Sequence, residues 1–183
     1  MTAEDCLRIP TSVYSGHLTD PKLLEVYYGA MHGEDIWMKH GIDPKKWAPV
    51  FLREFSLLQL PYFYLNRYAR QSYTEENGDY TVYFSEGVIS SGKDGRITKN
   101  GTVLKDGGNV LLPLNAENTT FFAYSENGRT GEWDIPDAEF SLAQIDSVTT
   151  EGNIPLGEVY IKNGKVFLDV IPGQAIVLRK TKS

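Results

Sequence analysis

The sequence is poor in residues that build disulfide-linked or metal-binding proteins. Among its 183 residues there are one cysteine, Cys6, and three histidines. A single cysteine excludes an internal disulfide framework and any metal site built from several cysteines. The histidines, His17, His32 and His40, lack the i, i+4 spacing of a zinc-binding helix. We therefore expect no metal and no other cofactor.

Positive charge is also scarce. Lysine and arginine number 18 against 24 aspartate and glutamate, and the formal net charge is −6. Because nucleic-acid binding needs a basic face, we expect no nucleic-acid partner. No apolar run approaches the roughly 18 residues of a membrane span, and the first ten residues show no signal peptide. The sequence therefore predicts a soluble protein with no membrane partner.

The patterns that are present divide the chain into two parts. Residues 1–71 carry apolar side chains at helical spacing, whereas residues 72–183 read as short strands divided by glycine and asparagine. Many short strands at this spacing are typical of an antiparallel sandwich. We therefore expect an α+β protein, with a short N-terminal helical segment followed by an antiparallel β-sandwich.

Helix starts are visible at Asp20-Pro21 and Asp43-Pro44, because aspartate caps a helix and proline suits its first turn. The apolar spacing behind these pairs predicts helices over 20–33 and 43–60, and a shorter one over 62–70. Ten strands are predicted in the second part, at 80–84, 87–90, 102–104, 110–113, 121–124, 131–135, 143–149, 158–162, 165–170 and 175–178.

Two turns give the clearest local predictions. Asn163-Gly164 predicts a type I′ hairpin, which would pair Ile161 with Val166, Val159 with Leu168 and Tyr160 with Phe167. The stretch Thr120–Pro136 also reads as a hairpin, because Glu-Asn-Gly separates two strand-like runs. Alternation along its second strand directs Trp133 and Ile135 to the buried face, where Trp133 would anchor the core.

Candidate functional residues are few. His17 follows a strand-like run through Gly16, at a position where barrel enzymes place substrate contacts. Glu34, Asp35 and Trp37 lie in a loop between two predicted helices, where they could line a cleft. These four residues are the candidates for substrate contact. Loops at Glu75–Asp79 and Asn115–Asn118 could also hold calcium, although they lack EF-hand spacing.

No catalytic pair is evident. Hydrolysis of a glycosidic bond normally needs two carboxyl groups roughly 5–10 Å apart across the bond. Asp20 and Asp43 are better explained as helix caps, and Glu34 and Asp35 are adjacent, so their side chains diverge. A small self-contained enzyme is therefore the least supported interpretation.

The order of segments resembles the C-terminal part of a bacterial glycoside hydrolase. WAPVFLREFSLLQLPYFYLNRY is similar to the last segments of a catalytic (β/α)₈ barrel. FFAYSENGRTGEWDIP and GEVYIKNGKVFLDVIPGQAIVL resemble strand pairs of the β-sandwich that follows the barrel. The family that they resemble is the endo-α-N-acetylgalactosaminidase family and its relatives.

The resemblance implies a carbohydrate-active enzyme whose catalytic residues lie on earlier barrel strands, so none is carried over. A barrel takes about 250 residues, which this chain cannot hold beside about 110 residues of β structure. We therefore expect a fragment or accessory portion that stabilises the barrel and is not catalytic alone. Its partner would be carbohydrate or the missing barrel, and its location secreted or periplasmic.

The alternative is a non-catalytic carbohydrate-binding or interaction module. This function requires exposed aromatic side chains that together form a platform on which a sugar can stack. Tyr80, Tyr83, Tyr124 and Trp133 are the candidates, although strand alternation buries about half of such positions.

Overall fold

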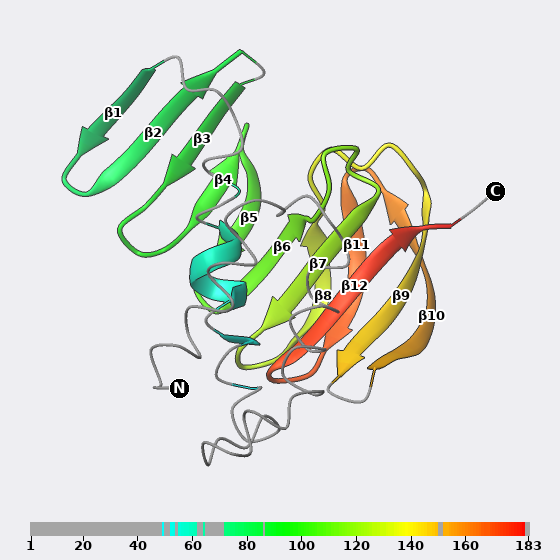
Figure 1. The fold of residues 1–183 in the computed structure, drawn as a ribbon. Helices are drawn as coiled ribbons and strands as arrows, with labels where there is room; N and C mark the ends of the chain where they lie inside the picture. The colour runs from blue at the N-terminus through cyan, green and yellow to red at the C-terminus, as the bar shows by residue number, and fades with distance from the viewer. Residues whose placement is uncertain are drawn as a thin grey trace, which may run out of the picture.

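The computed structural model describes residues 49, 52–53, 55–61, 64, 72–85, 87–149 and 152–181, where nearly all regular structure is antiparallel sheet (Figure 1). The described part contains a π-helical turn and twelve strands with these bounds: η1 Phe55–Gln59, β1 Ser72–Glu76, β2 Asp79–Phe84, β3 Gly87–Ser91, β4 Ile97–Lys99, β5 Thr102–Asp106, β6 Asn109–Pro113, β7 Thr120–Ser125, β8 Arg129–Asp134, β9 Leu142–Thr149, β10 Gly152–Lys162, β11 Lys165–Val170 and β12 Gln174–Lys180.

Hydrogen bonds join these strands into one sheet that folds over on itself. Strands β1 to β7 follow in order, and β12, β9 and β10 extend the sheet beyond β7. Strand β10 pairs with β9 from Gly152 to Tyr160, and with β11 at Ile161 and Lys162. It therefore leaves the main layer and enters a second layer, formed with β11 and β8. The second layer lies behind β7 and β12 in Figure 1.

The space between the two layers holds the inner core. Strand alternation explains this core, because successive side chains of a strand point to opposite faces of its layer. On β11, Val166, Leu168 and Val170 are buried while the residues between them are exposed. The inner core consists of Leu111, Phe121, Ala123, Trp133, Ile135, Ala143, Ile161, Val166, Leu168, Val170, Ile176 and Leu178.

The opposite face of the main layer is covered by residues from the N-terminal side of the sheet. We call the described residues between 52 and 64 the cover segment. Its Phe55 is 2% exposed and meets Phe122 of β7 edge to face, with ring centroids 5.5 Å apart. Leu52, Leu57, Leu60 and Tyr64 are buried in the same cluster. At β7 the main layer is thus covered on both faces.

The expected α+β class is wrong. No helix of seven residues or more occurs in the described part, and the five-residue η1 is the longest helical element there. The described residues of the helix predicted over 43–60 are helical, but they form only short α- and π-helical turns, whose apolar side chains cover the sheet. The helix predicted over 20–33 lies outside the described residues. So do residues 65–71, which leaves the domain boundary at 71 a prediction.

All ten predicted strands have a counterpart in the structure, and two strands were missed. β1 was missed because its polar sequence shows no apolar alternation. β4 has only three residues, too few for a periodic signal. No helix in the described part has the length and apolarity needed to cross a membrane.

The hairpin at Asn163-Gly164 forms, but its ladder is shorter than expected. Both turn residues have positive φ, 53° and 69°, and Ile161 pairs with Val166 as predicted. The expected pairs of Val159 with Leu168 and Tyr160 with Phe167 are wrong. Val159 and Tyr160 pair instead with Ala143 and Leu142 of β9, because β10 crosses between the layers at this point.

The stretch Thr120–Pro136 is not a hairpin. β7 pairs with β6 and β12 in the main layer, whereas β8 pairs with β11 in the second layer. Residues 126–128 therefore form an arch between layers. The predicted burial of Trp133 and Ile135 is confirmed, at 3% and 2% exposure. Gly128 has a φ of 82° in this arch, and a Cβ there would lie 2.9 Å from Pro172 Cδ.

Replacing Phe122 by alanine is expected to lower the free energy of unfolding by about 3–5 kcal/mol, because the buried ring leaves a cavity against Phe55. Phe167→Ala is the matched control: its ring is 60% exposed, so the change should stay within about 0.5 kcal/mol. Urea unfolding of both variants measures this difference. Equal losses would contradict the two-sided burial of β7.

Gly128→Ala is expected to destabilise the protein more than Gly101→Ala. Gly128 and Gly101 have φ values of 82° and 85°. Alanine at either position is therefore expected to lower the free energy of unfolding by about 1–2 kcal/mol. Only Gly128 adds the overlap with Pro172, which we expect to cost about 1–3 kcal/mol more. Thermal unfolding of the two variants compares them, and identical melting temperatures would exclude a tight arch.

Candidate functional site

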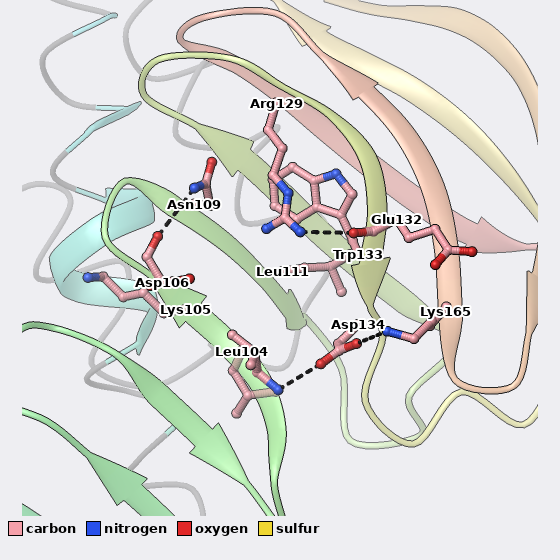
Figure 2. A pocket seen from close by; sticks show the side chains of 11 residues that line it. Leu104, Lys105, Asp106, Asn109, Leu111, Arg129, Glu132, Trp133, Asp134 and Lys165 are labelled. Atoms are coloured by element: carbon pink, nitrogen blue, oxygen red, sulfur yellow. Dashed lines mark hydrogen bonds and ion pairs between the residues drawn. The ribbon is translucent and has the colours of Figure 1, made fainter.

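A polar cleft of about 130 Å³ lies between β5 and β6 of the main layer and β8 at the edge of the second layer. β5 and the start of β6 form one wall, and β8 with Lys165 of β11 forms the other (Figure 2). Its lining residues are Val103, Leu104, Lys105, Asp106, Asn109, Leu111, Arg129, Glu132, Trp133, Asp134 and Lys165.

Asp134 connects the two walls of the cleft. Its Oδ1 accepts a hydrogen bond from Lys165 Nζ at 2.8 Å, and its Oδ2 accepts one from the Val103 backbone N–H at 3.1 Å. The hydrogen bond from Lys165 is the main reason that the pKa of Asp134 lies below its ordinary value. The same bond raises the pKa of Lys165. Both groups are therefore charged at neutral pH, and the hydrogen bond from Val103 of β5 to Asp134 ties the main layer to the second layer.

Arg129 covers Trp133 at the other end of the cleft. Its guanidinium carbon lies 4.6 Å from the centre of the indole ring, and Nη2 donates a hydrogen bond to the Glu132 carbonyl at 2.8 Å. Figure 2 shows the two side chains stacked. The indole Nε1 is buried with no hydrogen-bond partner among the described residues. Trp133 is therefore a core anchor whose remaining face is occupied by a cation.

The cleft does not have the chemistry of a glycosidase site. Glu132 and Asp134 share one face of β8. A general acid, however, needs a raised pKa, and that of Asp134 is lowered. The volume is also below the roughly 300–1,000 Å³ of typical ligand pockets. We conclude that the cleft braces the sandwich.

Lys105 supports the same conclusion. Burial lowers its pKa, and the nearby carboxylates of Asp106 and Asp94 oppose this shift. A lysine with a lowered pKa can act as a base or nucleophile. The ammonium of Lys105 instead donates to the Gly95 carbonyl at 2.9 Å, which fixes the loop before β4. Its role in this structure is positional.

The sequence candidates for substrate contact are not placed by the structure. His17, Glu34, Asp35 and Trp37 all lie outside the described residues, so they remain predictions. Four aromatic residues were predicted as candidates for a sugar-stacking platform. The prediction is wrong for Tyr124 and Trp133, because each is only 3% exposed. Tyr80 and Tyr83 are 44% and 39% exposed.

Two exposed aromatics were missed as functional candidates. Tyr160 is 68% exposed and Phe167 is 60% exposed, the highest values among the large apolar side chains of the described part. The alternation of β11 contained the signal, since inward Val166 and Leu168 require Phe167 to point outward. This signal was missed because Phe167 was predicted to pair with Tyr160 across the hairpin, and such a pair was interpreted as a stabilising contact.

The possible calcium loops have other roles. In the second loop the Asn115 side chain accepts from the backbone N–H groups of Thr119 and Thr120, both at 3.0 Å, and so holds the turn before β7. In the first loop, Asp79 accepts from the Lys93 N–H at 2.9 Å. Within the described part, no three acidic, histidine or cysteine side chains converge as a metal site would require.

Comparison with known proteins gives little further guidance. No protein-family model matches the sequence, and no curated protein matches it. Among solved structures, a GH30 endoxylanase from Clostridium papyrosolvens C71 is similar with a TM-score of 0.29 and 7% identity. The match covers 61% of this chain but only 22% of the endoxylanase chain. A likeness this weak carries no argument about fold or activity.

In the Asp134→Asn variant, the free energy of unfolding is expected to fall less between neutral and acidic pH than it does in the wild type. The pKa of Asp134 is lowered on folding, so this aspartate stabilises the folded state at neutral pH. That contribution is lost as the pH falls below about 4, where an unfolded aspartate takes up its proton. The variant should be less stable at neutral pH by about 0.2–1 kcal/mol, because the ion pair is partly exposed.

Urea unfolding at neutral pH and at about pH 3 measures this difference in slope. Glu117→Gln is the control, since Glu117 is exposed and lies outside the cleft. If acid destabilises Asp134→Asn and the wild type equally, Asp134 does not tie the layers.

Proposed function

We propose that this chain is the accessory portion of a carbohydrate-active glycoside hydrolase, which holds a catalytic region in place and is not catalytic alone. The observation that carries the proposal is the cover segment. Residues that precede the sheet in sequence bury Phe55, Leu57 and Leu60 against the main layer. The β-sandwich is thus a base against which the cover segment is docked.

The packing of the cover segment supports a holding role. Phe55, Ser56 and Leu57 are all buried, and the Ser56 hydroxyl donates to the Leu52 carbonyl at 2.6 Å. Each buried apolar side chain contributes about 1.5–3 kcal/mol relative to an exposed one. Four or five such side chains resist separation of the segment from the sheet. The sequence resemblance to the end of a barrel covers these same residues.

The braced cleft supports a non-catalytic role. In the described part the carboxylate with a shifted pKa is Asp134, and its shift favours the charged form. Its two oxygens are occupied by Lys165 and Val103. The proposal therefore assigns hydrolysis to residues outside the described part or to another polypeptide.

An antibody raised against the purified chain tests this function. In cells that make the protein, the immunoprecipitate is expected to hydrolyse at least one substrate in a panel of polysaccharides and aryl glycosides. The purified 20.6 kDa chain is expected to hydrolyse none. Preimmune serum provides the control for adsorbed enzymes.

Two results would overturn the proposal. An immunoprecipitate without hydrolase activity would separate the chain from any glycosidase. Hydrolysis by the purified chain, abolished in Glu132→Gln or Asp134→Asn, would show that the cleft itself is catalytic.

A further inference from the structure

The second layer of the sandwich turns one face to solvent, which we call the outer face. It bears the side chains that alternate with the inner core on β8 and β11 and at the end of β10. These residues are Thr130, Glu132, Asp134, Tyr160, Lys162, Lys165, Phe167 and Asp169. In the described part β5 reaches this face at Asp134, through the Val103 N–H, while the two aromatic rings are mostly accessible.

The register places the two rings on the same face of neighbouring strands, although their residues are not a ladder pair. Ile161 pairs with Val166 and both point inward, so the next residues outward on each strand are Tyr160 and Phe167. The two strands separate at this position, as β10 turns to β9. The ammonium of Lys162 lies 5.9 Å from the centre of the Tyr160 ring, which confirms that both occupy the same face.

Polar groups surround the rings in a fixed order. Glu132 of β8 lies opposite Phe167, and Asp134 lies opposite Lys165. Asp134 is paired with Lys165, and Asp169 accepts a hydrogen bond from the Thr130 hydroxyl. Two lysines thus face three carboxylates. The face is close to neutral and presents both hydrogen-bond donors and acceptors beside an apolar centre.

We propose that the outer face binds a neutral carbohydrate, with a sugar ring stacked on Tyr160 and Phe167. A pyranose presents a face of C–H groups to an aromatic ring and a rim of hydroxyl groups that both donate and accept. The two exposed aromatic rings match the C–H face of the sugar. Lys162 and Glu132 match its hydroxyl rim. This inference rests on the proposed function and names the ligand class that the accessory portion would contact.

The charge pattern and the strand edge argue against other occupants. A nearly neutral face gives no electrostatic attraction for nucleic acid or anionic lipid. Strand addition from a second copy would use the edge of β10 from 152 to 160, which has no second partner among the described strands. That edge carries Pro155 and a bulge between Pro155 and Gly157, and both features oppose strand pairing.

The binding experiment uses the full chain and four insoluble neutral probes: xylan, cellulose, chitin and granular starch. Depletion of the protein from solution is measured for the wild type and for the double variant Tyr160→Ala/Phe167→Ala. We expect the wild type to bind at least one probe and the double variant to bind it about tenfold more weakly or worse, since two ring contacts are lost. Because both rings are exposed, the double variant should melt like the wild type.

Tyr80→Ala is the matched control. Tyr80 is also an exposed tyrosine and lines a separate hollow of about 420 Å³ beside β2, β3 and β4. This variant should bind as the wild type does. Loss of binding in Tyr80→Ala with retention in the double variant would move the site to that hollow and overturn the proposal.

Two further outcomes would also overturn it. One is a wild-type chain that binds none of the probes; the other is a dimer in size-exclusion chromatography that the double variant abolishes without any carbohydrate binding. Failure here is separable from failure of the proposed function. An active immunoprecipitate with no direct binding by the chain would reject the outer face alone, whereas direct binding with an inactive immunoprecipitate would reject only the link to a hydrolase.

Discussion

Two-sided burial of β7 is the constraint on which the rest of this structure depends. All six residues of β7 are buried, with Phe121 in the inner core and Phe122 against the cover segment. A strand of this kind is stable only if both of its faces are covered and both of its edges are paired. β6 and β12 pair with the edges, while the second layer and the cover segment supply the two faces. The removal of any one of them exposes an apolar surface to water.

The sequence was sufficient to locate strands but not to pair them. Strand positions follow from local alternation and turn residues, and the inward direction of Trp133 could be read in the same way. Pairing depends on which faces are buried over long distances. β7 and β8 looked like a hairpin because a short Glu-Asn-Gly turn joins them, yet β7 needs partners on both edges and finds them in β6 and β12. The α+β expectation failed for a different reason: the described residues before the sheet form only short helical turns that cover one of its faces.

The site was harder to anticipate than the fold. Side-chain type indicated Trp133 and Tyr124 as platform aromatics, but exposure is decided by the layer to which a strand belongs. Phe167 is exposed because no element of the described part covers the outer face at this position, a property that no local pattern records. The result is a division of roles: the main layer holds the preceding chain, and the second layer presents aromatic rings and balanced charges to solvent.

The position of β12 has a consequence for how the protein is made. β12 is the last of the described strands in sequence, yet it lies in the middle of the main layer, between β7 and β9. While the chain is being synthesised, β7 and β9 have no partner on those edges until residues 174–180 leave the ribosome. Such long-range closure slows folding and leaves an apolar edge open during translation. The sheet is therefore completed only after residues 174–180 have been synthesised.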